Sequence, residues 1–357
     1  MKKHSFLISG GGTGGHIFPA IAIGKELQEK YPDANIHYVG AKDKMEMQKV
    51  PEAGFTIDGL WISGIDRKLS TKNLSFPFKL ISSLWKSFFI IKKHKPDIAI
   101  GVGGFASGPL LFMANLLGKP TLVQEQNSYP GITNKLLSKK ADKLCVAFEG
   151  MERFFPKNKI VITGNPIRPQ LLSCDATASE ARRHFGLDDK PTILIIGGSL
   201  GARTINQAIE KDLQLLKEED IQILWQTGKS YTNGPEVFGK RTVFIKEMDL
   251  AYRAADLVIS RAGASSLSEL SALGKACILV PSPNVTEDHQ TKNAMALVNK
   301  NAAVLVKDSE ALQDLVPTAL DLMAQPEKRD ELIKNITPLG LKEATKTIVS
   351  EIEKLIQ

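Results

Sequence analysis

The 357-residue sequence has few cysteines and no long apolar run, and both absences narrow the classes of protein to consider. Its three cysteines, Cys145, Cys174 and Cys277, are scattered and lack metal-ligand spacing, which indicates a reducing cytoplasm rather than a disulfide framework. No run of ~18 apolar residues could span a bilayer. Because Met1–His4 leads directly into an apolar strand, we expect no signal peptide and a soluble or peripheral protein.

Two glycine-rich turns lie about half the chain apart. Residues 10–16 read Gly-Gly-Gly-Thr-Gly-Gly-His, and residues 197–202 read Gly-Gly-Ser-Leu-Gly-Ala. Each follows a short apolar run, Phe6–Ser9 or Thr192–Ile196, which predicts a buried parallel strand, and each opens a helical segment. Glycine lets a ligand approach the backbone closely, and the N–H groups at a helix start favour phosphate. The sequence therefore predicts an α/β fold with two Rossmann-like domains and a phosphorylated ligand.

Short apolar runs alternate with helical segments along the whole chain, as is typical of α/β folds. Because residues 167–189 are polar and irregular, we place the boundary at 164–166, which gives domains 1–164 and 165–357. Leu341–Gln357 has the pattern of a closing amphipathic helix, and packing back on the first domain is an alternative for it. The further expected strands are Asn35–Val39, Asp97–Val102, Thr121–Gln124, Leu144–Phe148, Ile221–Gln226, Thr242–Ile245, Leu257–Ser260 and Ala276–Val280.

Several ligand signatures are missing. Gly10, Gly12 and Gly15 match G-x-G-x-x-G, but the acidic residue that NAD or FAD binding needs after the second strand is replaced by Gly40-Ala41-Lys42. Neither glycine turn ends in the Gly-Lys-Ser/Thr of a P-loop, which disfavours ATP hydrolysis. The chain also has no Asp-x-Asp triplet to hold a divalent ion on a diphosphate. The net charge of +7 favours an anionic partner: a nucleotide, a nucleic acid or a lipid surface.

His16 is the candidate general base. It lies at the expected start of the first helix, where the helix dipole disfavours protonation and leaves a neutral imidazole that can accept a proton. The alternative is that His16 caps the helix or hydrogen bonds a neighbouring loop. A third glycine turn, Gly101–Gly108, also joins a strand to a helix. Gly103 and Gly104 in it are candidates for binding a second diphosphate, and close helix-to-strand packing is the alternative.

The second half contains two polar candidates of its own. Ser260–Glu269 joins a strand to a helix, so its backbone N–H groups are placed to hold a diphosphate and Glu269 to bind ribose hydroxyls. Alternatively, Ser265 or Ser266 is an ordinary N-cap and Glu269 a solvated charge. Downstream, Glu287–Gln290 offers polar groups for sugar hydroxyls, although exposed loops are commonly polar.

Phe76–Lys95 has the pattern of a basic amphipathic helix, with lysines recurring every seven residues. Its apolar residues are too numerous for one narrow stripe, so we expect part of the helix to pack on the core and part to contact an anionic membrane. An ordinary helix packed on the sheet is the alternative. The expected membrane patch consists of Leu80, Ile81, Leu84, Trp85, Phe88, Lys79 and Lys86.

Taken together, these motifs resemble the MurG family, bacterial glycosyltransferases that move N-acetylglucosamine from UDP-GlcNAc onto lipid I to make lipid II. The resemblance covers nearly the whole chain. It is carried by residues 10–20, 101–109, 125–131, 164–168, 197–202 and 261–269.

The resemblance implies a GT-B fold, with two Rossmann-like domains facing a cleft. The N-terminal domain would handle the acceptor and the membrane, and the C-terminal domain would bind UDP-GlcNAc. The implied reaction is an inverting transfer to the 4-hydroxyl of N-acetylmuramic acid, without metal or other cofactor, and with helix N-termini compensating the leaving-group charge. It implies a role in peptidoglycan synthesis, hence in cell-wall biogenesis, cell shape and cell division, and a peripheral position on the cytoplasmic face of the bacterial inner membrane. Its partners would be UDP-GlcNAc, lipid I, an anionic membrane surface and other cell-wall synthesis proteins, but no nucleic acid.

The resemblance also implies roles for individual residues. Glu269 is similar to the carboxylate that holds ribose, Ile245 to the position whose backbone reads uracil, and Ser199 to the serine at the diphosphate. Where some members carry two adjacent glutamines, this chain has His289-Gln290, which leaves Gln290 as the sugar-binding glutamine. The remaining implied substrate contacts are Thr13, Gly14, Gly15, Asn127 and Arg168.

Three other functions remain open at this point. A GT-B enzyme acting on another lipid, such as a diacylglycerol sugar transferase, would share the fold and the membrane patch. A non-hydrolysing UDP-GlcNAc epimerase would bind the same donor without a lipid acceptor. A catalytically silent nucleotide-sugar sensor would bind the donor without turnover, and the presence of His16 argues against it.

Overall fold

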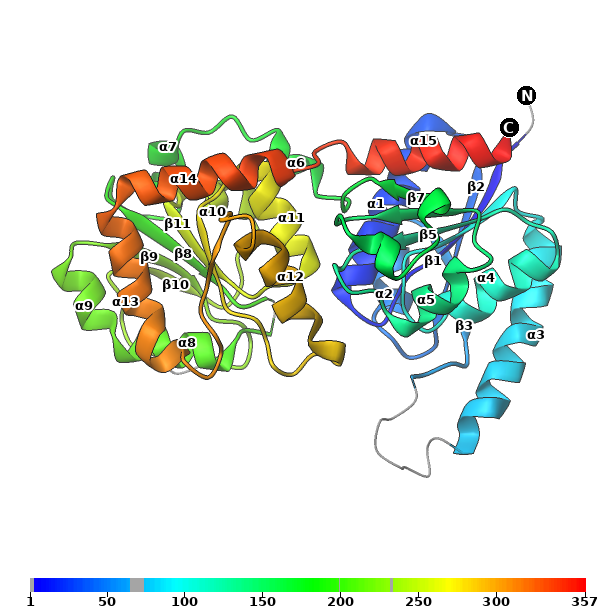
Figure 1. Cartoon of the computed structure of the whole chain (residues 1–357), viewed down its shortest axis with the longest axis horizontal. Helices are drawn as coiled ribbons and strands as arrows, with labels where there is room; N and C mark the ends of the chain where they lie inside the picture. The colour runs from blue at the N-terminus through cyan, green and yellow to red at the C-terminus, as the bar shows by residue number, and fades with distance from the viewer. Residues whose placement is uncertain (1–2, 65–73, 199, 232–233) are drawn as a thin grey trace. The chain divides into compact units, whose positions relative to one another are not determined.

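The structure, a computed structural model, describes residues 3–64, 74–198, 200–231 and 234–357. The chain divides into two compact units: Met1–Ile167 together with Glu343–Gln357, and Arg168–Lys342 (Figure 1). The expected boundary after residue 164 lies three residues before this division. Each unit is an α/β domain built around a parallel sheet, which confirms the expected fold class of two Rossmann-like domains.

Unit 1 contains a seven-stranded parallel sheet with the order β3-β2-β1-β4-β5-β6-β7. The branched runs of the sequence form these strands because both faces of the sheet are covered by helices. The strands are β1 (Ser5–Ser9), β2 (Asn35–Ala41), β3 (Thr56–Leu60), β4 (Ile98–Gly101), β5 (Thr121–Glu125), β6 (Lys143–Val146) and β7 (Ile160–Ile162). The helices are α1 (Gly14–Lys30), α2 (Glu46–Glu52), α3 (Phe76–His94), α4 (Ser107–Leu116), α5 (Ile132–Ser138) and α15 (Ala344–Ile356).

The last helix, α15, belongs to unit 1 and packs against α1 (Figure 1). Ile348, Val349 and Ile352 on its apolar face enter the core on the α1 side of the sheet. At its outer end, Glu353 accepts hydrogen bonds from Lys30 Nζ at 2.6 Å and from Tyr31 OH at 2.6 Å. Packing on the first domain is the alternative that the sequence left open for this helix.

Unit 2 contains a six-stranded parallel sheet with the order β10-β9-β8-β11-β12-β13. Its strands are β8 (Thr192–Ile196), β9 (Gln222–Gln226), β10 (Gly239–Thr242), β11 (Leu257–Ser260), β12 (Cys277–Leu279) and β13 (Val304–Leu305). Its helices are α6 (Pro169–Leu172), α7 (Ala178–His184), α8 (Arg203–Lys211), α9 (Leu213–Glu218), α10 (Met248–Ala254), α11 (Ala264–Leu273), α12 (His289–Val298), α13 (Ala311–Ala324) and α14 (Pro326–Ile336).

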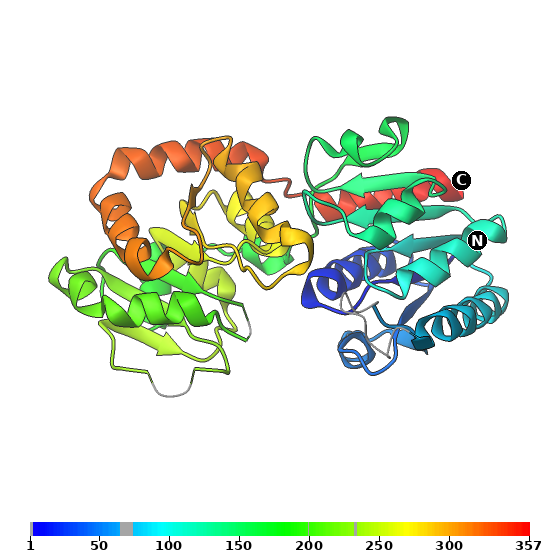
Figure 2. The same ribbon diagram turned by 60° about the horizontal axis from the view of Figure 1, so that its bottom comes forward.

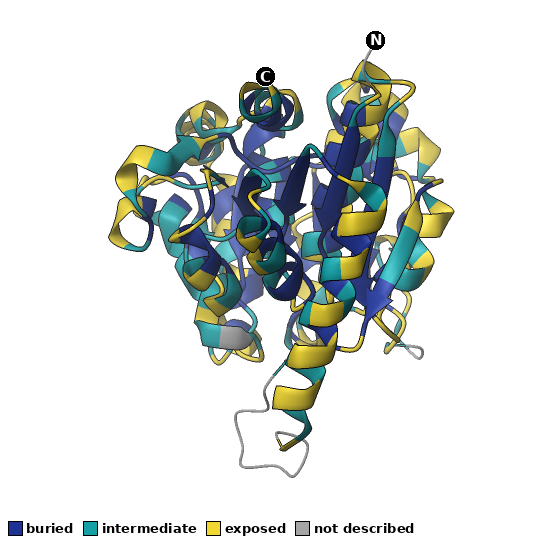
Figure 3. Ribbon diagram, turned by 90° about the vertical axis from the view of Figure 1, so that its right-hand side faces the viewer, coloured by how far each residue is buried: buried dark blue, intermediate teal, exposed yellow. Residues whose placement is uncertain are grey.

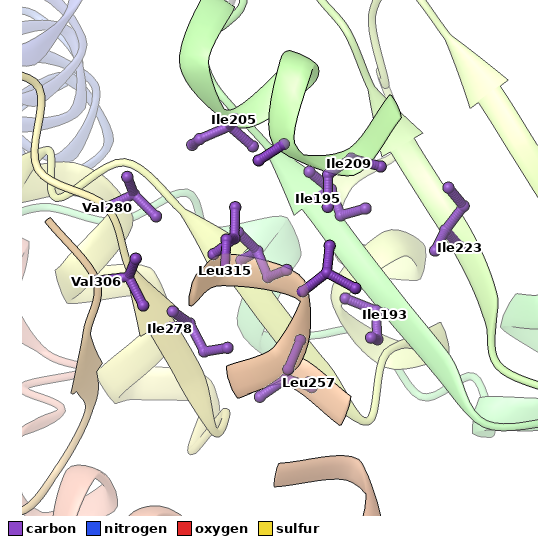
Figure 4. Close-up of a cluster of buried hydrophobic side chains, with 14 of the residues drawn as sticks. Ile193, Ile195, Ile205, Ile209, Ile223, Leu257, Ile278, Val280, Val306 and Leu315 are labelled. Carbon is purple, nitrogen blue, oxygen red and sulfur yellow. The ribbon is translucent and has the colours of Figure 1, made fainter. Parts of the chain in front are cut away.

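The core of unit 2 lies between its sheet and the helices α8 and α13, which pack against each other (Figure 2). Figure 4 shows Ile193, Ile195 and Ile223 from the sheet meeting side chains of both helices. Among these, Ile205 from α8 and Leu315 from α13 have no exposed surface. Full burial of such side chains stabilises the unit by about 1.5–3 kcal/mol each.

The strand order places the glycine turns at equivalent points of the two units. In unit 1, β1 lies between β2 and β4, and in unit 2, β8 lies between β9 and β11. Successive connections leave in opposite directions at these points, and open α/β sheets commonly bind ligands at the carboxyl ends of the strands there. The turns that follow β1 and β4 therefore lie side by side, as do those that follow β8 and β11.

Most of the expected strands are present, and four differences have physical causes. The expected strand Thr242–Ile245 lies three residues too late, because β10 uses the polar residues Gly239–Thr242 at the edge of the sheet. The edge strands β3, β7 and β13 were not expected. Edge strands are covered on fewer sides, so they need less of the apolar signal on which sequence analysis depends.

Candidate functional site

The first glycine turn leads from β1 into α1, and no side chain caps the start of that helix. Thr13 is the N-cap of α1, but its side chain makes no capping hydrogen bond, and the first helical turn has no acidic residue. Thr13 and Gly15 are exposed, and Gly14 is partly exposed. The helix dipole adds positive potential here. The three residues predicted to contact the sugar-nucleotide substrate therefore lie where a phosphate or hydroxyl oxygen is favoured.

His16 is held by the turn that precedes it. Its Nδ1 lies 3.0 Å from the carbonyl oxygen of Gly11 and 3.4 Å from Oγ1 of Thr13. A carbonyl oxygen can only accept a hydrogen bond, so Nδ1 carries the proton of the neutral ring and Nε2 has the lone pair. The loop contact given as the alternative for His16 is therefore present. It also favours the tautomer with an unprotonated Nε2, the form in which this nitrogen can accept a proton.

The third glycine turn packs directly on the first. Gly103 and Gly104 have φ values of +97° and +88°, and the Gly11 N–H donates to the Gly103 carbonyl at 3.3 Å. A Cβ at Gly103 would lie 2.8 Å from His16 Nε2, and one at Gly104 would lie 2.4 Å from the Gly11 oxygen. The third turn is therefore packed closely against the first turn, and Gly103 lies next to Nε2 of His16.

Asn127 belongs to a loop organised by a buried carboxylate. Glu125, at the end of β5, accepts hydrogen bonds from the backbone N–H and the side chain of Asn127, at 2.9 and 3.2 Å. The Gly131 N–H and Asn134 Nδ2 donate to its other oxygen. Burial raises the pKa of Glu125, and the four hydrogen bonds oppose this rise. The side chain of Asn127 is therefore oriented by Glu125.

In unit 2, two of the predicted binding residues contact each other. Arg168 donates from Nε and Nη2 to Oε1 of Glu269, at 3.2 and 3.0 Å. Tyr252, from α10, donates to the other oxygen at 3.0 Å. Burial raises the pKa of Glu269, and the neighbouring Arg168 acts against this rise. Glu269 is thus a buried, paired carboxylate on α11, which excludes the alternative of a solvated helical charge.

The second glycine turn is held by backbone contacts. Gly201 has a φ of +84°, and a Cβ there would lie 2.0 Å from the Thr227 carbonyl oxygen. A Cβ at Gly228 would lie 2.1 Å from the Gly201 nitrogen, so the turns after β8 and β9 touch. Ser199, the residue expected at the diphosphate, lies outside the described residues.

Gln226 connects this turn with the predicted uracil-reading position. Its Nε2 donates to the Gly198 carbonyl at 3.0 Å, and its Oε1 accepts from the Ile245 N–H at 2.9 Å. The Ile245 side chain is buried. The Ile245 N–H is therefore bonded within the protein, and a nucleobase that used it would have to displace Gln226. Sequence analysis missed Gln226, because a single glutamine at a strand end carries no motif.

The start of α11 has no side-chain cap. Gly263 is the N-cap, and the first turn contains no acidic residue. The alternative that Ser265 or Ser266 caps this helix is excluded, because both lie inside its first turn. The positive end of the helix is thus left without a protein carboxylate, which suits an external anion.

Gln290 lies in the first turn of α12. Its Oε1 accepts the Ser282 N–H at 2.8 Å, which joins the helix start to the loop after β12. Glu287 and Asp288, just before the helix, have φ values of +55° and +51°. Residues other than glycine rarely adopt this left-handed conformation, and such strain is typical of functional loops.

The surface of α3 differs in part from the predicted patch. Leu80 packs against the core, while Ile81 and Trp85 are 65 and 67 % exposed. Figure 3 shows that much of the ribbon of α3 is coloured as exposed. Leu84 and Phe88 are partly buried. The exposed apolar stripe, which we call the α3 stripe, consists of Leu74, Phe78, Ile81, Trp85 and Phe89.

The two lysines predicted to belong to the membrane patch form hydrogen bonds with other residues of unit 1. Lys79 Nζ donates to Ser63 Oγ, and Lys86 Nζ donates to the Gly59 carbonyl, both at 2.9 Å. Lys86 also pairs with Asp58 at 3.4 Å. Both ammonium groups therefore already bind protein atoms, which leaves them less able to bind a membrane surface. No helix among the described residues is long and apolar enough to cross a membrane.

One group of side chains in unit 1 has the composition of a metal site. His37, Asp58 and His94 offer ligand atoms that all lie within 4.8 Å of one another. However, the two imidazole rings stack at 4.0 Å with an interplanar angle of 19°, so one ion cannot lie in both ring planes. His37 Nε2 bonds Asp58 at 3.1 Å, and Lys86 pairs with the same carboxylate. The arrangement is a stacked histidine pair in which His37 is hydrogen bonded to Asp58, and its geometry does not fit a metal centre.

Comparisons with known proteins cover almost the whole chain. Residues 6–146 match the glycosyltransferase family 28 N-terminal domain, and residues 192–352 match the family 28 C-terminal domain. A Flavobacterium psychrophilum protein named UDP-N-acetylglucosamine--N-acetylmuramyl-(pentapeptide) pyrophosphoryl-undecaprenol N-acetylglucosamine transferase is 56% identical, over 100% of this chain and 99% of its own length. A Cytophaga hutchinsonii protein of the same name is 54% identical, over 99 and 98%. The crystal structure of MurG from Acinetobacter baumannii superposes with a TM-score of 0.79 at 29% identity, covering 99% of this chain and 100% of that one.

Proposed function

Because the chain belongs to glycosyltransferase family 28, we propose that it transfers N-acetylglucosamine from UDP-GlcNAc to lipid I, undecaprenyl-pyrophosphoryl-MurNAc-pentapeptide. The products are lipid II, with a new β-1,4 bond, and UDP. The observation that carries this proposal is the full-length identity of 56% to a relative named for the same transfer. The enzyme therefore acts in peptidoglycan synthesis.

His16 is the proposed general base. Its Nε2 accepts the proton of the acceptor 4-hydroxyl while that oxygen attacks the anomeric carbon of the donor sugar. The bond between the anomeric carbon and the diphosphate oxygen breaks, and UDP leaves with the electron pair. Attack from the face opposite UDP inverts the anomeric configuration. The Nδ1–H bond to Gly11 supports this role, because it keeps the lone pair on Nε2.

Unit 2 is the proposed donor-binding unit. Glu269 binds ribose hydroxyls, the Ile245 backbone binds uracil in place of Gln226, and Gln290 binds the sugar. The uncapped starts of α8 and α11 support charge compensation by backbone N–H groups as UDP departs. We therefore propose that transfer needs no metal ion. Further proposed donor contacts are Thr13, Gly14, Gly15, Asn127, Arg168 and Ser199.

Unit 1 is the proposed acceptor-binding unit. The Gly103-Gly104 turn holds the acceptor diphosphate, an assignment supported by its contact with His16. The α3 stripe inserts into the interface of the cytoplasmic leaflet, where the polyprenyl chain of the acceptor resides. This makes the enzyme a peripheral protein of the bacterial inner membrane, where it meets other proteins of cell-wall synthesis.

The transfer itself is the first experiment. Purified enzyme is incubated with labelled UDP-GlcNAc and a short-chain lipid I analogue in EDTA, and label in the lipid and released UDP are measured together. We expect equal amounts of both without added metal. UDP-GlcNAc binding without transfer would favour another lipid acceptor or a sensor. Transfer only after a divalent ion is added would overturn the metal-free part of the proposal.

Vesicle binding tests the role of the α3 stripe. The double variant Phe78→Ser and Trp85→Ser should sediment less with anionic vesicles than the unchanged enzyme does, because both side chains are more than 60 % exposed. The control is Leu312→Ser, which changes an exposed apolar residue on α13 of unit 2. Equal vesicle binding by all three proteins would exclude this stripe as the membrane contact.

A further inference from the structure

Glu46 lies beneath the first glycine turn and has no assigned role. It is the first residue of α2, and none of its surface is exposed. Among the described residues, no lysine, arginine or histidine forms an ion pair with it. Burying a carboxylate is costly unless other donors satisfy it, so its position calls for an explanation.

Two backbone N–H groups satisfy this carboxylate. The Gly12 N–H donates to Oε2 at 2.9 Å, and the Ala41 N–H, at the end of β2, donates to Oε1 at 3.0 Å. A Cβ at Gly11 would lie 2.2 Å from Oε1, so the turn rests directly on Glu46. Glu46 therefore ties the glycine turn to the end of the neighbouring strand.

The same peptide group connects Glu46 with His16. The Gly12 N–H that bonds Glu46 and the Gly11 carbonyl that bonds His16 Nδ1 belong to one peptide plane. In a trans peptide these two groups point in opposite directions, so Glu46 lies on one side of the plane and His16 on the other. Because both residues are glycines, this peptide could flip at little steric cost. A flip would turn the carbonyl oxygen toward the carboxylate and remove the nearest acceptor of His16 Nδ1, leaving the longer contact with Thr13 Oγ1 at 3.4 Å.

We propose that Glu46 is a positioning residue that fixes the tautomer of His16 by locking the Gly11–Gly12 peptide. The carboxylate accepts from the Gly12 N–H and repels the carbonyl of the flipped peptide. His16 therefore keeps its Nδ1 proton and presents Nε2. This inference rests on the proposed function in so far as His16 is the general base.

The tautomer can be measured without any activity assay. In histidine-labelled enzyme, the ¹⁵N shifts of His16, assigned with the His16→Ala variant, should show a protonated Nδ1 and an unprotonated Nε2. In Glu46→Gln the new NH₂ group can donate to the flipped carbonyl, so we expect a mixture of tautomers or the opposite one. Glu351→Gln is the matched control, because Glu351 is also a buried glutamate of unit 1, on α15. It should leave the spectrum of His16 unchanged.

Kinetics separate a positioning role from a structural one. Glu46→Gln should lower kcat at least tenfold, with KM for UDP-GlcNAc within threefold of the unchanged enzyme. In a His16→Ala background the same change should alter kcat less than threefold, because residues that act as a unit have non-additive effects. Glu46→Asp keeps a carboxylate that repels the flipped carbonyl, so it should retain the tautomer and more activity than Glu46→Gln.

Three results would overturn the proposal: one tautomer and normal kcat in folded Glu46→Gln, an equal loss of kcat in the His16→Ala background, or a Glu46→Asp enzyme in which the tautomer is lost. If Glu46→Gln does not fold, the Glu46→Asp spectrum decides. Absence of transfer by the unchanged enzyme would contradict the proposed function instead, and the spectra would still test Glu46.

Discussion

The two units place a glycine turn at the same point of similar sheets but support it with different side chains. In unit 1, the Glu46 carboxylate accepts from the Gly12 N–H, and Ser107 Oγ donates to the Gly103 carbonyl at 2.9 Å. In unit 2, the Gln226 amide donates to the Gly198 carbonyl at 3.0 Å, and the turns after β8 and β9 also meet backbone to backbone, at Gly201 and Gly228. A carboxylate can only accept, so it favours one orientation of the peptide that it binds, whereas an amide both donates and accepts.

The carboxylates of the two units differ in the partners that they bind. Glu46 and Glu125 in unit 1 are buried and accept hydrogen bonds from backbone N–H and amide groups. Glu269 in unit 2 is paired with Arg168, whose side chain is 47 % exposed, and with Tyr252. A carboxylate that only orders loops can be committed to the backbone permanently. One that binds a ligand benefits from a partner that solvent and substrate can reach.

The largest expected effect separates chemistry in unit 1 from binding in unit 2. His16→Ala should lower kcat at least 100-fold, since general-base catalysis contributes about 10²- to 10⁴-fold. UDP-GlcNAc affinity should change little, because the proposed binding carboxylate and the nucleobase position belong to unit 2. Transfer assays and titration calorimetry measure the two quantities. A variant with near-normal turnover would place the base elsewhere.

A substitution in the proposed nucleotide site of unit 2 should mainly weaken UDP binding. Glu269→Gln removes the charge that pairs with Arg168, and loss of a hydrogen bond to a charged group costs about 1.5–3 kcal/mol, so UDP binding should weaken at least tenfold. Glu310→Gln, at an exposed glutamate of the same unit paired with Lys307, is the matched control. Calorimetry with UDP compares the two variants. Equal affinities would remove Glu269 from the nucleotide site.

Backbone contact in unit 2 can be tested with two glycines of one turn. Gly201 and Gly198 have similar φ values, +84° and +82°, but only a Cβ at Gly201 meets other atoms, the nearest at 2.0 Å. Gly198→Ala should cost about 1–2 kcal/mol of unfolding free energy from strain alone. Gly201→Ala should cost about 1–3 kcal/mol more from overpacking. Urea denaturation measures both, and equal losses would show that the two turns are not in firm contact.

The smallest expected effect is on the pH dependence of stability, through the histidine pair of unit 1. Burial lowers the pKa of His37 and of His94 below the ordinary value of 6.5, although neighbouring Asp58 opposes the change. The unfolded chain therefore binds more protons than the folded one below about pH 6.5, and stability should fall as the pH drops through that region. Replacing His94 by phenylalanine keeps an aromatic ring and should flatten the dependence. Urea denaturation midpoints at pH 7.5 and 5.5 are measured for the unchanged enzyme and for the variant. If the midpoint changes equally with pH in both, the histidine pair is not the origin of the pH dependence.

Much of the fold could be predicted from the sequence, because buried parallel strands are short, branched and apolar. The predicted runs Thr192–Ile196 and Leu257–Ser260 agree with β8 and β11 at both ends. The edge strands were harder. β10 is polar, and β13 consists of two residues, so neither carries a strong apolar pattern. Their formation depends on neighbours in the sheet.

The residues of the candidate site also divide into those with a local signal in the sequence and those without one. His16 and the glycine turns carry local signals, since a strand, a run of glycines and a helix start lie next to one another in the sequence. Glu46 and Gln226 carry none, because each acts on residues that are distant along the chain: Glu46 on Gly12, and Gln226 on Gly198 and Ile245. The expected membrane patch included Leu80, which packs against the core because of contacts that the sequence pattern does not contain.

The sequence by itself determined the two α/β units, their glycine turns and the place of His16, because these depend on local apolar patterns and on the absence of a Cβ. Only the tertiary structure decided which nitrogen of His16 is protonated, which carboxylates order loops and which side of α3 is exposed. Those properties depend on hydrogen bonds and contacts between segments that are far apart in the chain, and a linear pattern does not contain them.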